Sequence, residues 1–299
     1  MANDGMFIVG SDNFDRALDL GMYPALAYLV LARGTQRNNT TTAWSAKAVK
    51  TAIGVRWHKC HDAIALLLDA ELISTKQGKA RARPLYRLAP MEGDKIFLPN
   101  TLVDGLDDAD APLRRIRESQ NPDVLKLLIA FYRLQNLAAE HGINREWLHN
   151  PADVEYIIDI GQFKVWEASP QGVMRTRWDG ELAKPWVRSP DGFWTAVNAL
   201  RNMGLIEVAW YVTDADGELL YPFSAEIQDA IQGFIDAREI PSQPTWGSDW
   251  QFLTLHHQDN PQFIGLYRVR FRTPHTSVTG EWLAEVKQME SNLIGRLKW

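Results

Sequence analysis

The segment YPALAYLVLARG, residues 23–34, has apolar side chains on every face of a helix that Pro24 can begin and Gly34 can end. A helix without a polar face has to be covered by other elements on all sides. The chain must therefore build a core around this segment. With 299 residues, of which 45% are hydrophobic and 23% charged, it is long enough for two domains with separate cores.

The next 55 residues or so alternate between helix signals and turn signals. Ser45 is a good N-cap for a short helix that ends at Ile53, and Gly54 is a good terminator. A second helix is expected over 56–70, with its apolar stripe on Val55, Cys60, Ile64, Leu67 and Leu68. The segments LIST and PLYRL then predict two short strands joined by a basic loop around Gly78.

Positive charge is concentrated in the same region. The formal net charge of the chain is -5, but residues 33–87 contain eleven Lys or Arg and three acidic residues, so this segment alone is +8. The stretch STKQGKARARPLYRL, residues 74–88, has five cations and no acid. Such a split favours a local surface for a polyanion, and a solvated face without function is the alternative.

The order helix, short helix, tight turn, helix, hairpin over residues 20–90 resembles the winged helix-turn-helix fold of bacterial transcription regulators and of plasmid and phage replication initiators. The resemblance covers about a quarter of the chain. It implies that 45–53 is the supporting helix, 56–70 the recognition helix and 72–88 the wing. A large residue, Trp57, departs from what a groove-facing position usually holds and could instead pack on the supporting helix or stack on a sugar.

The resemblance also implies DNA-contacting residues. A helix about 10–12 Å wide fits the major groove, where its first turns reach base edges while neighbouring residues contact phosphates. The residues expected at base edges are Arg56, His58, Lys59 and His61, those expected at phosphates from the supporting helix are Lys47 and Lys50, and those of the basic wing 74–88 are Lys76, Lys79, Arg81, Arg83 and Arg87.

The rest of the chain suggests a second unit of the same kind with opposite charge. An acidic, turn-rich segment lies at 96–112, and a helix is expected from Asn121 to Gly142. Farther on, 192–223 predicts a helix followed by a hairpin whose turn carries Asp214, Asp216 and Glu218, which would repel phosphate. This acidic unit is expected to pack against or bind a partner protein.

The final 60 residues suggest two paired strands and a terminal helix. WQFLTLHH and FIGLYRVRFRT carry the strand pattern. The helix would have an apolar stripe that either packs on the body of the protein or forms a dimer contact, made of Trp282, Val286, Met289, Leu293 and Leu297.

These patterns predict a mainly α fold with small β hairpins (α+β). It would comprise an N-terminal winged helix-turn-helix domain over 1–92, a connecting segment over 93–120, and a second winged-helix-like domain over 121–299 that includes the terminal strand pair and helix.

Signals for catalysis are weak. His58, Cys60 and His61 lack the spacing of metal ligands on a helix, and His256 and His257 would point to opposite faces of a strand. There is no phosphate-binding glycine loop and no nucleophile elbow. We therefore expect no enzyme, no cofactor and no metal, although a nuclease within 225–299 remains an alternative.

One cysteine, Cys60, excludes an intrachain disulfide and fits a reducing compartment, and no apolar run reaches the roughly 20 residues of a membrane span. We expect a cytoplasmic protein without membrane contact. Its expected partner is double-stranded DNA, bound as a transcription regulator or a replication initiator, with a homodimer or a protein partner possible through the acidic second domain and the terminal helix. The alternative is a winged-helix adaptor that binds proteins and not DNA.

Overall fold

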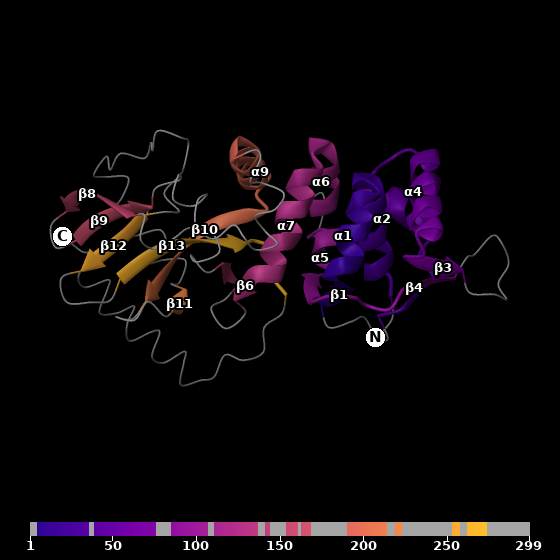
Figure 1. Ribbon diagram of the computed structural model, residues 1–299, viewed down its shortest axis with the longest axis horizontal. Helices are drawn as coiled ribbons and strands as arrows, with labels where there is room; N and C mark the ends of the chain where they lie inside the picture. The colour runs from indigo at the N-terminus through magenta and orange to yellow at the C-terminus, as the bar shows by residue number, and fades with distance from the viewer. Residues whose placement is uncertain are drawn as a thin grey trace. The chain divides into compact units, whose positions relative to one another are not determined.

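The structure is a computed structural model in which the chain forms two compact units (Figure 1). Unit 1 consists of Met1–Arg133, Ala196–Leu205 and Arg270–Pro274, and unit 2 of Leu134–Thr195, Ile206–Val269 and His275–Trp299. The structure describes residues 5–35, 39–75, 85–106, 111–136, 141–143, 154–160, 163–168, 190–213, 219–222, 253–257 and 262–273.

Unit 1 is mainly helical and has two small antiparallel sheets. Its described helices are α1 (Ser11–Asp19), α2 (Met22–Arg33), α3 (Ala46–Ile53), α4 (Trp57–Asp69), α5 (Thr101–Asp104), α6 (Pro112–Ser119) and α7 (Pro122–Leu134). Its described strands are β1 (Met6–Gly10), β2 (Thr41–Thr42), β3 (Ile73–Thr75), β4 (Tyr86–Leu88) and β5 (Lys95–Pro99).

The core of unit 1 forms around α2, as its sequence predicts. All residues from Pro24 to Ala32 are buried. Helix α2 contacts α1, α3, α4 and β1, so apolar neighbours cover it on every side. Burial of an apolar side chain in such a core stabilises a fold by about 1.5–3 kcal/mol, which makes this helix the main organising element of the unit.

The predicted hairpin is present and has a third strand. β3 and β4 pair antiparallel, with Ile73 opposite Leu88, and β2 pairs with the other edge of β4, which places β4 in the centre. The residues of β2 belong to no element that the sequence predicts. In the second sheet, β1 and β5 pair antiparallel from Met6 opposite Pro99 to Gly10 opposite Lys95.

Residues 93–120, expected to connect two domains, are instead built into unit 1. They contain β5, α5 and α6, and β5 supplies the strand that pairs with β1. Helix α6 contacts α2 and α3. Although its sequence is acidic and rich in turn residues, this segment therefore supplies a strand and two helices to unit 1.

Helix α7 begins where the sequence predicts and ends earlier. The side-chain oxygen of Asn121 accepts a hydrogen bond of 2.9 Å from the backbone N–H of Asp123, which is an N-cap contact. The helix ends at Leu134 and not near Gly142. The strand pair β6 (Gln135–Asn136) and β7 (Gly142–Ile143) takes over the backbone hydrogen bonds, so tertiary pairing overrides helix propensity here.

Unit 2 contains an antiparallel sheet of eight strands, which is larger than the small hairpins expected. The strand order is β11-β10-β13-β12-β9-β8, and β7 pairs with both β13 and β6. The further strands are β8 (Val154–Ile160), β9 (Phe163–Ala168), β10 (Ile206–Thr213), β11 (Leu219–Pro222), β12 (Leu253–His257) and β13 (Gln262–Val269). Helix α9 (Pro190–Asn202) contributes residues to both units.

The expected pairing of the two C-terminal strands is confirmed, because β12 and β13 pair antiparallel with Thr254 opposite Ile264. The second expected hairpin is present as β10 and β11, but β10 also pairs along its whole length with β13. This hairpin is therefore part of a broad sheet and does not stand alone. Asp214, Asp216, Glu218 and the expected helix at 282–297 lie outside the described residues.

Candidate nucleic-acid interface

Helices α3 and α4 are joined by a turn of three residues. Gly54 ends α3 in the left-handed conformation, with φ of 65°, and its N–H donates to the carbonyl of Lys50 at 2.9 Å. Glycine adopts this conformation without the steric cost of a side chain. Ser45 occupies the N-cap position in an extended conformation, but its side chain makes no capping hydrogen bond. The expected helix-turn-helix geometry therefore depends on the glycine more than on the serine.

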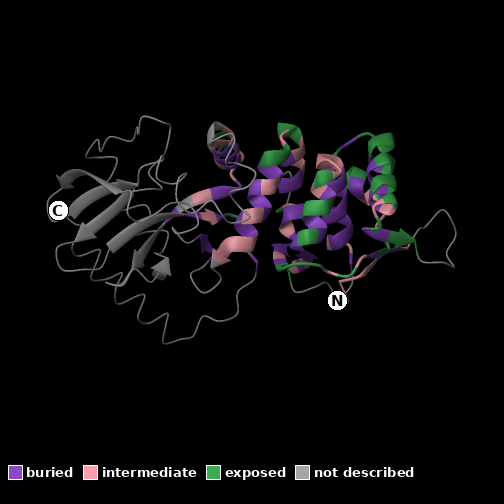
Figure 2. Cartoon of the chain, in the orientation of Figure 1, coloured by how far each residue is buried: buried purple, intermediate pink, exposed green. Residues whose placement is uncertain are grey.

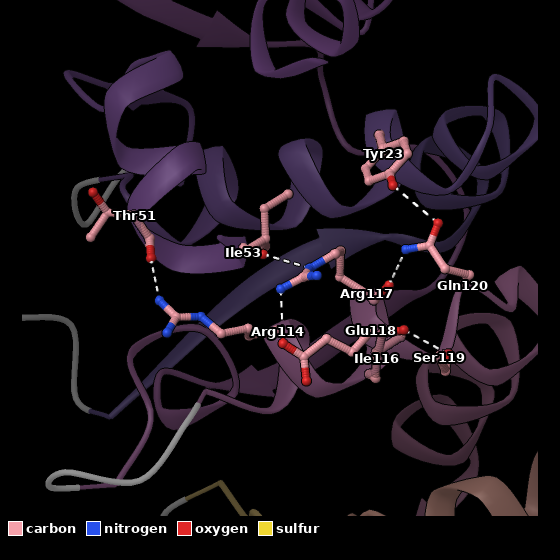
Figure 3. A network of polar contacts seen from close by, with 9 residues as sticks. All are labelled: Tyr23, Thr51, Ile53, Arg114, Ile116, Arg117, Glu118, Ser119 and Gln120. Atoms are coloured by element: carbon pink, nitrogen blue, oxygen red, sulfur yellow. Dashed lines mark hydrogen bonds and ion pairs between the residues drawn. The ribbon is translucent and has the colours of Figure 1, made fainter. Parts of the chain in front are cut away.

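Two arginines of α6 hold the end of α3 (Figure 3). Nη2 of Arg114 donates to the carbonyl of Thr51 at 2.8 Å, and Nε of Arg117 donates to the carbonyl of Ile53 at 2.9 Å. The last carbonyls of a helix lack partners within the helix and carry partial negative charge, so guanidinium groups stabilise them. The sequence interpretation missed these arginines, whose only local signal is the pattern PLRRIR.

The inner face of the helix pair is apolar. Ala46, Val49 and Ile53 of α3 are buried. The buried residues of α4 are Cys60, Ala63, Ile64 and Leu67. Burial also raises the pKa of the Cys60 thiol, an effect that the charge of nearby Lys50 partly opposes. Lys50 therefore lies close to the N-terminal half of α4.

The outer face of α4 is exposed along its length (Figure 2). Because successive helical residues are rotated by about 100°, His58, Asp62, Ala65 and Asp69 follow the middle of this face. The cationic residues lie at its N-terminal end, where the first turn contains no acid. Asp62 lies in its second turn and Asp69 at its C-terminal end. A polyanion would therefore meet favourable charge without an opposing acid only at the first turn of α4.

Every predicted DNA contact that lies among the described residues is exposed to solvent. Those on α3 are Lys47 and Lys50, those on α4 and its N-cap are Arg56, His58, Lys59 and His61, and the one on β4 is Arg87. Within β4, Tyr86 and Leu88 are buried, so Arg87 lies on the opposite, outer face. Four predicted wing residues lie outside the described residues, namely Lys76, Lys79, Arg81 and Arg83.

Lys59 is engaged within the protein. Its ammonium lies 4.6 Å from the centroid of the Tyr23 ring and donates to the Tyr23 hydroxyl at 3.4 Å. That hydroxyl donates to Oε1 of Gln120 at 3.1 Å. Desolvation opposes the effect, but the hydrogen bond that Lys59 donates, together with the positive charges of Lys59 and Arg117, lowers the pKa of Tyr23. Lys59 therefore links the start of α4 to α2 and to the end of α6.

Trp57 is 49% exposed at the first turn of α4. Its ring packs against that of His61, one helical turn later, with 4.5 Å between centroids and an interplanar angle of 69°. Residues four apart lie on the same side of a helix, which allows this edge-to-face contact.

The geometry also bears on metal binding near α4. Cys60 faces the core, whereas His58 and His61 face solvent, so these three side chains do not converge. Across the described ranges, no group of three or more His, Cys, Asp or Glu side chains is arranged to hold a metal ion.

Comparison with protein-family models, curated protein sequences and solved structures found no match. Among the helices that the structure describes, none combines the length and the apolar character needed to cross a membrane.

Proposed function

We propose that unit 1 is a winged helix-turn-helix module that binds duplex DNA, with α4 as its recognition helix. The observation that carries the proposal is the distribution of side chains on α3 and α4. Their apolar residues face the core, and their cations are exposed, those of α4 at its N-terminal end. The element order α3, turn, α4, β3, β4 and the additional strand β2 on β4 support the same fold.

The dimensions of α4 suit the major groove. An α-helix with its side chains is about 10–12 Å across, and the major groove of B-form DNA is about 12 Å wide. In the proposed complex, Arg56, His58 and His61 approach base edges from the first two turns. Lys47 and Lys50 of α3 contact phosphates. Lys59 contributes charge while it remains bound to Tyr23.

The strand β4 supports a further backbone contact. Arg87 lies on the outer face of the hairpin, opposite the buried side chains of its two neighbours. Together with the wing residues expected from the sequence, it would contact phosphates beside the groove, where such contacts fix register and orientation. In this proposal the protein acts as a transcription regulator or a replication initiator.

A second candidate function rests on the other half of α4. Leu66 is 42% exposed, and three exposed acids lie near it in the chain, Asp62, Asp69 and Glu71. An exposed apolar residue among acids fits a basic protein partner better than DNA. This is the adaptor alternative, in which the fold binds a protein through the C-terminal half of α4.

Binding of a random-sequence duplex separates the two functions. Fluorescence anisotropy of a labelled duplex, measured from about 50 to 200 mM salt, should show binding that weakens with a slope of roughly -4 to -5 in log affinity against log salt, if about five phosphates are neutralised. The adaptor would show no binding even at the lowest salt. Replacing Arg81 and Arg83 together by Ala should flatten the slope by up to about two, and an unchanged slope would remove the wing from the proposed complex.

A further inference from the structure

Trp57 is an exposed aromatic side chain at the start of α4. About half of its surface is exposed, and it projects from the first turn of α4, on the outer side of the helix pair. Its ring contacts that of His61, which is itself exposed. An exposed indole forgoes the burial that usually stabilises a tryptophan in a core, so this position points to a contact made with another molecule.

The surroundings of Trp57 define the charge of that molecule. Arg56 precedes it and His58 follows it, both exposed, whereas the Lys59 ammonium lies over the Tyr23 ring. The first turn of α4 holds no acidic residue. An arginine beside one apolar side chain, with no acid in the same turn, complements a polyanion that also offers an apolar group, and a neutral apolar protein surface would leave the arginine uncompensated.

The chemistry of duplex DNA narrows the contact further. Base faces are covered by stacking in a B-form duplex, so an indole in the major groove meets base edges and not base faces. The apolar group that these edges offer is the C5 methyl of thymine. Contact between this methyl and the indole removes apolar surface of both groups from water, which is favourable.

We propose that Trp57 is a specificity-determining residue that contacts thymine methyl groups in the major groove, with His61 as the residue that positions its ring. This inference rests on the proposed DNA binding and adds the base that is recognised. The edge-to-face contact with His61 restricts the rotamers of the indole before DNA arrives, which lowers the entropy lost on binding.

The test uses the full chain and one DNA pool made in two forms. A random duplex pool is enriched by three rounds of binding to the unchanged protein. It is then amplified once with thymidine triphosphate and once with deoxyuridine triphosphate. The two forms differ only in the C5 methyl groups, which the deoxyuridine form lacks. Competition between the two forms measures the ratio of their affinities. We expect the thymidine form to bind about fourfold more tightly for each methyl group contacted.

Variants of the protein test whether the indole of Trp57 causes the difference in affinity between the two forms of DNA. Trp57→Ala should bring the ratio close to one, and Trp57→Phe should leave an intermediate value because a smaller ring remains. His61→Ala should lower the ratio by less than Trp57→Ala does. Leu66→Ala is the matched control: it removes an exposed apolar side chain from the far end of the same helix and should leave the ratio unchanged.

The outcomes are distinct. Absence of binding to either form would remove the proposed function and this inference with it. Equal binding of the two forms by the unchanged protein would overturn the inference and leave DNA binding intact. An equal loss of affinity for both forms in Trp57→Ala would overturn it as well, because the indole would then make a contact that does not involve the methyl group. A ratio lowered equally by Leu66→Ala would have the same consequence.

Discussion

Nε of Arg117 donates a hydrogen bond of 2.9 Å to the carbonyl of Ile53, so a residue of α6 closes the last turn of α3 from 64 positions away in the sequence. The adjacent turn leads directly into α4. The orientation of the proposed recognition helix therefore depends on an arginine that lies outside the helix-turn-helix segment.

Replacing Arg117 by Ala should lower the free energy of unfolding by about 1–3 kcal/mol, because it leaves the carbonyl of Ile53 without its charged hydrogen-bond donor. Urea denaturation followed by circular dichroism measures the change. Glu118→Ala is the control, since Glu118 is exposed and pairs with the same arginine at 2.9 Å. It should cost no more than about 0.5 kcal/mol. Equal losses in both variants would show that the bond to Ile53 has no special importance.

Gly54→Ala should destabilise the protein by about 1–2 kcal/mol, because the residue has φ of 65° and an L side chain is strained there. The added Cβ would also lie 3.3 Å from Nη2 of Arg117. Thermal unfolding measures the effect. Gly54→Asn is the matched variant: asparagine tolerates the left-handed region better and should lose less. A greater loss for Asn than for Ala would contradict the conformational explanation.

Charge removal on α3 should change the salt dependence of DNA binding. If Lys47 and Lys50 each neutralise a phosphate, the double Ala variant should flatten the slope of log affinity against log salt by about two. The measurement is the anisotropy titration described for the random duplex. Lys95→Ala is the control, since Lys95 is an exposed cation of β5 within the same unit. A slope that responds to Lys95 as strongly as to the α3 pair would indicate unspecific attraction.

Two buried tyrosines predict loss of stability in alkali. Burial raises the pKa of both Tyr28 and Tyr132 above the usual value of 10.0, and the Tyr132 hydroxyl donates to the carbonyl of Phe271 at 2.6 Å. The unfolded chain ionises near pH 10 while the folded protein keeps these protons. Their contribution is therefore fully present below pH 10 and is lost above it, by about 1.4 kcal/mol per pH unit for each tyrosine.

Urea unfolding at several values between pH 9 and pH 11 tests this. Tyr132→Phe should be less stable at pH 9, by about 1 kcal/mol for the lost hydrogen bond, but should lose stability less steeply above pH 10. The comparison uses the slope with pH and not the absolute value, so the cost of the missing hydroxyl does not obscure it. Identical slopes in the two proteins would mean that Tyr132 ionises in the folded state near its usual pKa.

Several elements could be predicted because their signals are local. Helix α2 has apolar side chains on all faces and must therefore be buried. The N-cap contact of Asn121 and the left-handed conformation of Gly54 follow from the residue types at helix ends. The cations of α4 are exposed because helical spacing places them on other faces than the apolar stripe, which is buried. These features need information from only a few neighbouring positions, which the sequence contains.

Other features could not be read from the sequence because they depend on distant pairing. Helix α7 ends at Leu134 since the next residues pair as a strand with β7. The eight-stranded sheet joins segments far apart in the chain, such as Gly142 of β7 opposite Arg268 of β13, and strand pattern alone does not define the partner of a strand. In the same way, the sequence predicts Lys59 as a DNA contact because it is a cation at the start of a helix. Only the fold shows that its ammonium lies over the Tyr23 ring.

The sequence alone determined that a fully apolar helix must lie inside a core, that a glycine must separate two helices after it, and that positive charge must collect along 33–87 despite a net charge of -5. The tertiary structure decided which backbone groups those helices would use as partners. It brought Arg114 and Arg117 to the end of α3 and β1 to β5. The physical reason is that buried donors and acceptors must be satisfied, and the chain can satisfy them only with the groups that folding brings close.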